Sequence, residues 1–332
     1  MTSSLNCNNP VFIFGCARSG TSLLSRILNS HPNIAVPYES HLYNVFMPWL
    51  KYYGDLSEDK NRRQLICDMH DILHDWSPRV DKDAAFNATK QYDIHGVIDG
   101  VISSYSTAQG KKRWGEKSPW HVFYWKEILE GFPNAKFIHI VRDGRDSSAS
   151  WMQARFGPKH YYMLAKRWKE YLETVAEFKQ AIGKDNVLDI RYEDILADQE
   201  AATRKICGFI GEEYSIEMLD FHKNKTPYPT DNRNLENLTK PLMTDNAQKW
   251  RKNLSDRDIY IFESVAGKQL KEYGYEVINQ SAKLSVLNIF IIRYLIHPLL
   301  RIRSMSKNIK GQIDGSKKLF VYLRLRLGLW RF

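Results

Sequence analysis

Residues 10–30, which read PVFIFGCARSGTSLLSRILNS, constrain the fold more than any other part of the sequence. Val11–Phe14 form an apolar run of the length of a buried strand, and apolar residues recur with helical spacing from Leu23 onwards. Gly15 and Gly20 bracket the turn between these two segments. Glycines let backbone N–H groups converge on one point, and the following helix directs its positive N-terminal end there. The stretch therefore predicts a strand, a phosphate-binding loop and a helix.

The loop differs from the one that binds nucleoside triphosphates, which ends in Gly-Lys-Ser/Thr. Here Gly20 is followed by Thr21 and Ser22, and Arg18 is the only cation of the loop. A phosphate would be held by backbone amides, two hydroxyls and a guanidinium, without an evident metal. Two other interpretations remain open. One is an ordinary strand-to-helix turn whose Arg18 points into solvent, and the other is a P-loop kinase or NTPase, for which Asp143 would be the acid that holds Mg²⁺.

The segment GCARSGTSLLSRILNSHP resembles the 5′-phosphosulfate-binding loop of the sulfotransferases that use 3′-phosphoadenosine 5′-phosphosulfate (PAPS), especially the tyrosylprotein-type and bacterial carbohydrate-type enzymes. The resemblance runs from Pro10 to Val277 through five motifs in the same order. It implies a P-loop-like, three-layer α/β/α fold with a central parallel sheet, a sulfotransferase domain at residues 10–278 and a basic amphipathic tail at residues 279–332. It also implies PAPS as the sulfuryl donor, no metal, and donor contacts from the loop residues Arg18, Ser19, Gly20, Thr21 and Ser22.

Extended and helical segments alternate along the rest of the body. Strands are predicted at Ile34–Val36, Arg113–Lys117, within FPNAKFIHIV and at Val187–Arg191, and helices at residues 40–76, 94–106, 120–129, 143–155, 159–182 and 256–273. Such alternation indicates a parallel sheet covered on both faces. Ligands of these sheets bind at the carboxyl ends of the strands, where four polar residues fall: Arg18, Lys117, Arg142 and Tyr192.

Three later motifs match nucleotide-binding parts of the resembling enzymes. KFIHIVRDGRDSSAS resembles the 3′-phosphate motif and implies that Arg142 and Ser150 bind that phosphate, which suits a guanidinium because its planar fork donates two charge-assisted bonds. The alternative is a strand-end ion pair between Arg142 and Asp143, with Asp143 capping the helix. RYEDIL implies a nucleotide contact from Tyr192, and TKPLMTDNAQKWRKNLS implies a closing loop that includes Lys249.

The resemblance also implies a catalytic base. The attacking hydroxyl must lose its proton as the new bond forms, so a base is required within hydrogen-bond reach. Glu39 stands at the spacing from Arg18 at which the tyrosylprotein sulfotransferases carry their catalytic glutamate. His41 and His121 are the alternative bases.

Lys117, in WGEKSP, resembles the lysine that stabilises the bridging oxygen as the sulfuryl group leaves. An extended strand places Glu116 and Lys117 on opposite sides, so only one of them can reach the cleft, and a structural Glu–Lys pair is the alternative. The resembling enzymes carry a serine before the closing loop where this sequence has Arg233 and Asn234. Which residue takes over the role of that serine stays open.

Positive charge is concentrated at the end of the chain. Of the 332 residues, those from Lys283 to Phe332 include eleven Lys or Arg and one acid, Asp314, so this segment carries the whole formal net charge of +10. The body is neutral, which argues against nucleic acid as a partner. The apolar runs of the tail are too short and too charged to span a membrane, and their mixture with arginine predicts peripheral contact with an anionic membrane. Packing of a basic helix on the body or on a partner is the alternative.

The spacing of the cysteines and the N-terminal sequence indicate the cellular compartment of the protein. Cys7, Cys16, Cys67 and Cys207 show no C-x-x-C spacing, which argues against zinc and against a disulfide framework. Without signal-peptide features, the sequence predicts a cytoplasmic enzyme, peripheral on the inner membrane face if the tail binds lipid.

The expected acceptor is a hydroxyl on a glycan or a lipid-linked carrier, with protein tyrosine or a small molecule as alternatives. A catalytically inactive nucleotide-binding adaptor is the alternative to an enzyme. The sequence leaves the oligomeric state open.

Overall fold

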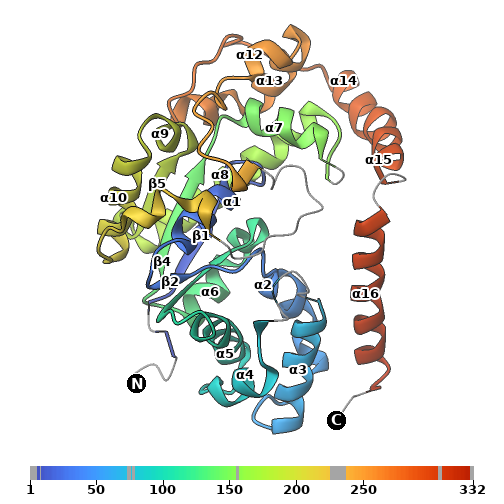
Figure 1. The fold of residues 1–332 in the computed structure, drawn as a ribbon. Helices are drawn as coiled ribbons and strands as arrows, with labels where there is room; N and C mark the ends of the chain where they lie inside the picture. The colour runs from blue at the N-terminus through green and yellow to red at the C-terminus, as the bar shows by residue number, and fades with distance from the viewer. Residues whose placement is uncertain are drawn as a thin grey trace.

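The computed structural model describes residues 6–329 except residues 8, 73–75, 77–78, 155–156, 225–236 and 306–308. Within this part of the chain one parallel sheet occupies the centre of the molecule (Figure 1), with strands β1 (Val11–Phe14), β2 (Ile34–Ala35), β3 (Arg113–Lys117), β4 (Lys136–Val141) and β5 (Val187–Arg191). The strand order is β2-β3-β1-β4-β5. The predicted strands and the parallel sheet are confirmed.

Alternate residues of β1 face opposite sides of the sheet. Val11 and Ile13 belong to one apolar core, whereas Phe12 and Phe14 belong to the other, and all four are at most 1% exposed. A strand buried on both faces needs an uninterrupted apolar sequence such as VFIF instead of an alternating one. Both faces are covered by helices, so the predicted three-layer α/β/α architecture is confirmed.

The helices divide between the two faces of the sheet. The smaller core contains side chains from α1 (Thr21–Asn29), α9 (Tyr192–Ala197) and α10 (Gln199–Ile210). The larger core contains side chains from α2 (Leu42–Phe46), α3 (Asp59–Ile72), α4 (Lys82–Ala88), α5 (Ile94–Thr107), α6 (Trp125–Gly131), α7 (Gly144–Gln153), α8 (Tyr161–Ile182) and α13 (Asp256–Glu272). The short helix α12 (Trp250–Asn253) lies near α13 (Figure 1).

Two of the predicted helices are broken in the structure. The helix predicted for residues 40–76 consists of α2, the 3₁₀ helix η1 (Met47–Tyr52) and α3, with Pro48 in the first turn of η1 and Gly54 at a φ of 69° before α3. The helix predicted for residues 120–129 begins as the 3₁₀ helix η3 (Pro119–Tyr124) and continues as α6. Proline lacks the N–H that a helix interior needs, and glycine accepts the left-handed conformation that ends a helix. Short 3₁₀ helices also occur at η4 (Lys184–Asn186), η5 (Ile216–Met218), η6 (Phe221–Lys223) and η7 (Asn237–Thr239).

The tail forms helices that run along one side of the body (Figure 1). They are α14 (Val286–Ile291), the π-helical turn η8 (Ile292–Ile296), α15 (His297–Met305) and α16 (Ile309–Arg326). Ile292 packs with Tyr162 and Ile261, and the buried Arg324 of α16 forms an ion pair with the buried Asp68 of α3. The alternative that the tail packs on the body is therefore confirmed at these contacts. Among the helices that the structure describes, none is long and apolar enough to cross a membrane.

Candidate active site

Glycines shape the loop between β1 and α1. Gly20 is the N-cap residue of α1 at a φ of 92°, and a Cβ on Gly15 would lie 2.7 Å from the carbonyl oxygen of Ile140, so β1 and β4 approach closely there. No side chain in the described part of the chain caps the start of α1. The backbone N–H groups of Thr21 and Ser22, in its first turn, can therefore serve a bound anion.

A pocket of about 1060 Å³ opens where this loop meets the ends of the strands. Nine of the eleven predicted site residues line it: Arg18, Gly20, Thr21, Ser22, Glu39, Arg142, Ser150, Tyr192 and Lys249. The two others are buried outside the lining. Ser19 places its hydroxyl 3.3 Å from that of Ser147 on α7, and Lys117 contacts Glu39. The structure thus brings the predicted residues together at one edge of the sheet, while their individual roles stay predictions.

Two guanidinium groups enter the pocket from neighbouring strands. Arg18 follows β1 at a φ of 73°, and its Nε donates to Ser150 Oγ at 3.0 Å. Arg142 follows β4 and donates through Nη1 to the backbone oxygen of Arg18 at 3.4 Å, whereas its buried Nε has no hydrogen-bond partner among the described residues. Burial, followed by the charge of Arg142, lowers the pKa of Arg18. A buried donor without a partner beside a second cation favours a bound anion at this place.

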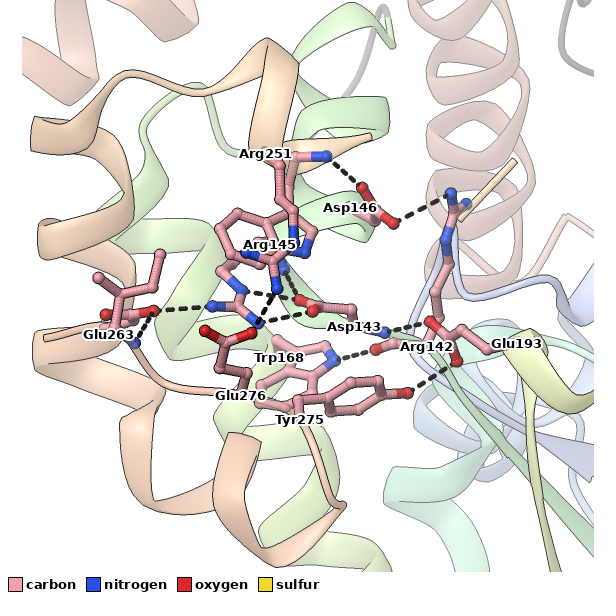
Figure 2. A network of polar contacts seen from close by, with 12 residues as sticks. Arg142, Asp143, Arg145, Asp146, Trp168, Glu193, Arg251, Glu263, Tyr275 and Glu276 are labelled. Atoms are coloured by element: carbon pink, nitrogen blue, oxygen red, sulfur yellow. Dashed lines mark hydrogen bonds and ion pairs between the residues drawn. The ribbon is translucent and has the colours of Figure 1, made fainter. Parts of the chain in front are cut away.

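Asp143 pairs with Arg145 and not with Arg142 (Figure 2). Its carboxylate accepts from the backbone N–H of Arg145 at 2.9 Å and from Nη2 of the same residue at 2.7 Å. Asp143 therefore caps α7, as one alternative predicted, but the ion pair of that alternative is wrong. The guanidinium of Arg142 instead lies 4.5 Å from the ring of Tyr192 and 3.9 Å from Asp146. Asp143 is the residue that the kinase interpretation assigns to Mg²⁺, and in the structure its carboxylate is engaged by Arg145.

A buried polar network ties the start of α7 to α12 and α13 (Figure 2). The backbone N–H of Trp250 donates to Asp146 Oδ1 at 2.6 Å, and the Arg145 guanidinium lies 3.6 Å from the centre of the Trp250 ring. Arg145 Nη1 also donates to Glu263 on α13 at 2.7 Å. The network fixes α12 against the helix that begins at the end of β4.

The segment before α12 covers the side of the pocket where Arg142 and Tyr192 lie. The backbone oxygen of Asn246 accepts from Arg142 Nη2 at 2.8 Å, and the Asn246 side chain donates to the hydroxyl of Tyr192 at 2.8 Å. Lys249, three residues later, lines the pocket. Residues 246–249 therefore lie where the sequence predicts a closing loop.

Glu39 lies between a lysine and a histidine. Its Oε1 accepts from Lys117 Nζ at 2.7 Å, and its Oε2 is 3.2 Å from His41 Nε2. Burial acts to raise the pKa of this carboxyl, but Lys117 and then His41 outweigh burial and hold the pKa well below its usual range. Lys117 Nζ also donates to Ser22 Oγ at 3.2 Å, which links Glu39 to the loop. Glu39 is thus ionised, and its side chain is 21% exposed.

Of the two alternative bases, His41 lines the pocket and His121 does not. His121 is fully buried, and its Nδ1 lies 2.7 Å from Glu116, which also accepts from two serine hydroxyls. Glu116 and Lys117 face opposite sides of β3, as strand alternation predicts, so a structural pair between them is wrong. Because His121 is enclosed beside Glu116 and does not line the pocket, His41 is the better placed of the two alternatives.

Several lining residues have no counterpart among the predicted site residues. They include Trp120 and Arg167, whose guanidinium lies 4.5 Å from the centre of the Trp120 ring, and three residues of α15, His297, Arg301 and Ser304. The last three recur at i, i+4 and i+7, which marks one face of a helix. That spacing is visible in the sequence, but it does not indicate which surface the face meets.

Two predictions about this site remain untested. Arg233 and Asn234, which stand where the resembling enzymes have a serine, lie outside the described residues. In the part of the chain that is described, no group of three His, Cys, Asp or Glu side chains is placed to hold a metal ion. That no metal takes part stays a prediction.

Sequence comparison relates the chain to known proteins. A family model described as the sulfotransferase family matches residues 10–215, which is more than half of the chain. A protein-tyrosine sulfotransferase of Drosophila melanogaster is 23% identical over 250 residues, covering 72% of this chain and 46% of that protein. Protein-tyrosine sulfotransferase A of Caenorhabditis elegans is 22% identical over 276 residues, covering 80% and 67% respectively. An uncharacterized protein of Aquifex aeolicus is 26% identical over 254 residues, covering 73% and 30%. The match thus spans less than half of the length of two of these relatives.

Two solved structures share the fold. The sulfotransferase domain from the Synechococcus PCC 7002 olefin synthase has a TM-score of 0.59 at 21% identity, covering 82% of this chain and 96% of that chain. The sulfotransferase domain from the curacin biosynthetic pathway has a TM-score of 0.58 at 18% identity, covering 82% and 99%. At these identities the likeness supports the arrangement of sheet and helices described above.

Proposed function

Because this chain belongs to the sulfotransferase family, we propose that it transfers the sulfuryl group of PAPS to the hydroxyl of an acceptor. The observation that carries the proposal is the single pocket shared by Arg18 and Arg142. Two cations at the ends of neighbouring strands suit a donor that carries phosphates at both ends of one adenosine. We further propose that residues 10–278 form the sulfotransferase domain and residues 279–332 a basic tail.

In this proposal the loop binds one end of the donor and Arg142 binds the other. Backbone N–H groups of the first turn of α1, the hydroxyls of Thr21 and Ser22, and Arg18 hold the 5′-phosphosulfate. Arg142, through its buried Nε, and Ser150 hold the 3′-phosphate, and the nucleotide is completed by contacts from Tyr192 and Lys249.

Ser19 supports the loop in this proposal instead of contacting the donor. Its N–H donates to the backbone oxygen of Cys16 at 3.0 Å, and its hydroxyl contacts Ser147. The N–H and the hydroxyl of Ser19 are therefore both engaged within the protein. Its contribution is to the shape of the turn.

Lys117 and Glu39 act together in the transfer. PAPS, when bound, would supply a sulfuryl group whose departure leaves negative charge on the bridging oxygen. The contact of Lys117 with Ser22 of the loop supports the proposal that Lys117 neutralises that charge. When Lys117 turns toward the leaving oxygen, Glu39 loses the main partner that keeps its pKa low. Glu39 then becomes a better proton acceptor for the attacking hydroxyl at the moment when the proton must leave.

The proposed acceptor is a hydroxyl on a glycan or on a lipid-linked carrier. Trp120 lines the pocket, is 44% exposed, and offers an aromatic face of the kind that packs on a sugar ring. Protein tyrosine is the second candidate, favoured by the protein-tyrosine sulfotransferases among the relatives. A small-molecule hydroxyl is the third.

We propose a cytoplasmic location for the enzyme. All four cysteines, Cys7, Cys16, Cys67 and Cys207, are free and buried. Free thiols persist in a reducing compartment, whereas small secreted domains tend to form disulfides.

A comparison of two ligands tests the donor assignment. A ligand at 100 times its dissociation constant stabilises a folded protein by about 2.7 kcal/mol, so adenosine 3′,5′-bisphosphate should raise the melting temperature and ATP with Mg²⁺ should leave it unchanged. The opposite result would favour a kinase or NTPase. Incubation with ³⁵S-labelled PAPS and a panel of glycan, lipid, tyrosyl and phenolic acceptors then tests transfer. Binding without transfer in wild type and Glu39→Gln alike would favour an inactive adaptor.

A further inference from the structure

The tail carries most of the large apolar side chains that the described surface exposes. Thirteen of the eighteen strongly exposed ones in the described part of the chain lie between residues 286 and 329: Val286, Leu287, Phe290, Tyr294, Leu295, Leu299, Ile302, Ile313, Leu319, Phe320, Leu323, Leu327 and Leu329. Individual exposed apolar residues are ordinary on a protein surface. Their concentration on consecutive helices marks an interaction surface.

Helix α15 presents different chemistry on two opposite sides. His297, Arg301 and Ser304 line the pocket that contains Glu39. Leu299 and Ile302 are 69% and 66% exposed. Successive residues of a helix are rotated by about 100°, so the side chains of Leu299 and Ile302 lie on the side of α15 opposite to the three pocket residues, called its outer side below. One helix is thus both a wall of the pocket and part of the apolar surface.

Helix α16 is likewise apolar on two sides. Val321 and Leu325 are each 4% exposed and belong to the large core of the body. Phe320, Leu323 and Leu327, at i, i+3 and i+7, are 65%, 46% and 71% exposed. Packing on the body therefore accounts for only one side of the helix, and a helix that is apolar on both sides normally has a second apolar neighbour.

The charge of the tail decides between possible neighbours. Arg293, Arg301, Arg303, Lys317 and Arg326 stand among the exposed apolar residues of these helices, and the last fifty residues contain one acid. A second copy of the chain would bring an equal charge of +10 against the first, and the two would repel. Apolar side chains flanked by arginine and lysine match the surface of an anionic bilayer, where the apolar groups enter and the cations meet lipid phosphates.

We propose that the tail docks on an anionic lipid bilayer through the outer sides of α15 and α16, and that the acceptor is therefore a membrane lipid or lipid-linked carrier that reaches the pocket along α15. The second part rests on the function proposed above. The cationic Arg301 has no acidic partner among the side chains that the structure describes, so it can meet an anionic head group as the acceptor enters.

Sedimentation of the full chain with vesicles tests the docking. Wild type should pellet with phosphatidylcholine vesicles that contain phosphatidylglycerol, and should bind vesicles of phosphatidylcholine alone far more weakly. The double variants Leu299→Glu/Ile302→Glu and Phe320→Glu/Leu323→Glu should each lose roughly tenfold or more in affinity. Ile216→Glu is the matched control, because Ile216 is 65% exposed on η5, outside the tail, and it should bind like wild type.

Three results would overturn the docking proposal. They are absence of wild-type binding to phosphatidylglycerol vesicles, equal binding by the outer-side variants, and a wild-type dimer in analytical ultracentrifugation that the same variants dissociate. The variants should keep the thermal shift with adenosine 3′,5′-bisphosphate, which shows that they are folded with an intact donor site.

The nature of the acceptor is tested separately by following the label. The full chain is incubated with ³⁵S-labelled PAPS and a lysate of its source cells, and the products are extracted with chloroform and methanol. Label in the organic phase, reduced for the outer-side variants, supports a membrane-borne acceptor, and label confined to protein or to the aqueous phase contradicts it. Vesicle binding without any label transfer contradicts the proposed enzymatic function and leaves the docking intact.

Discussion

Replacing Arg142 by alanine should remove discrimination between nucleotides with and without a 3′-phosphate. In the structure the guanidinium lies over the ring of Tyr192 and donates to the backbone oxygens of Asn246 and Arg18 at 2.8 and 3.4 Å. Its buried Nε has no partner among the described residues, and the longer bond leaves Nη1 weakly engaged. The N–H groups of Nε and Nη2 point to the same side of a guanidinium, so these two donors can form a pair of parallel bonds with one phosphate when Nη2 exchanges its contact with Asn246.

The expected magnitude follows from those two bonds. A hydrogen bond to a charged group contributes roughly 1.5–3 kcal/mol. Part of the gain is offset because Nη2 gives up its contact with the backbone oxygen of Asn246, so we expect a net loss of about 3 kcal/mol on substitution, which corresponds to roughly 100-fold weaker binding of adenosine 3′,5′-bisphosphate. Binding of adenosine 5′-phosphate, which lacks the 3′-phosphate, should change little.

Isothermal titration calorimetry with both nucleotides measures this selectivity. Arg204→Ala is the matched control, because Arg204 is an exposed arginine paired with Glu200 on α10 at 2.7 Å and does not line the pocket. Wild type and the control should prefer the bisphosphate, and Arg142→Ala should bind both nucleotides about equally. The reasoning is refuted if Arg142→Ala weakens both nucleotides by the same factor or leaves the preference intact.

Three further expectations concern Glu39 and the tail. Glu39→Gln should lower kcat by roughly 10²–10⁴-fold without changing calorimetric affinity for adenosine 3′,5′-bisphosphate, and an unchanged kcat would contradict its role as base. Because the pKa of Glu39 in the folded protein lies below the usual value of 4.5, its contribution to stability is present above pH 4.5 and is lost as the pH falls through the folded-state pKa. The difference in unfolding free energy between wild type and Glu39→Gln, from urea titrations at stepped pH, should therefore shrink below pH 4.5, and a difference that grows there would be inconsistent. Arg324→Ala leaves Asp68 buried without its cationic partner and should lower the unfolding free energy by roughly 3–5 kcal/mol in the same assay, whereas a loss below about 1 kcal/mol would mean that the tail barely contributes.

Local sequence features predicted the parts of this protein that depend on local physics. An uninterrupted apolar run identified β1 because a strand buried on both faces tolerates no polar residue. Glycine spacing identified the loop because Gly20 has to adopt a positive φ. Strand alternation correctly separated Glu116 from Lys117. The two predicted helices that the structure breaks are associated with prolines. Pro48 lies inside the first, and Pro119 stands directly before the second and begins η3.

Features that depend on distant parts of the chain could not be predicted from the sequence. Nothing near His121 indicates that it is buried against Glu116, outside the lining of the pocket. Arg301 stands 262 positions after Glu39, yet both line one pocket, and only the packing of α14 and η8 on the body brings them together. The strand order and the ion pair between Arg145 and Glu263 on α13 are likewise products of tertiary structure.

A crystal structure of the protein with adenosine 3′,5′-bisphosphate measures the central claim most directly. We expect the 5′-phosphate within hydrogen-bond distance of the N–H groups at the start of α1, and the 3′-phosphate on Arg142 and Ser150, with one nucleotide joining the two. A nucleotide that leaves either Arg18 or Arg142 without a phosphate, or that binds outside this pocket, would contradict the claim.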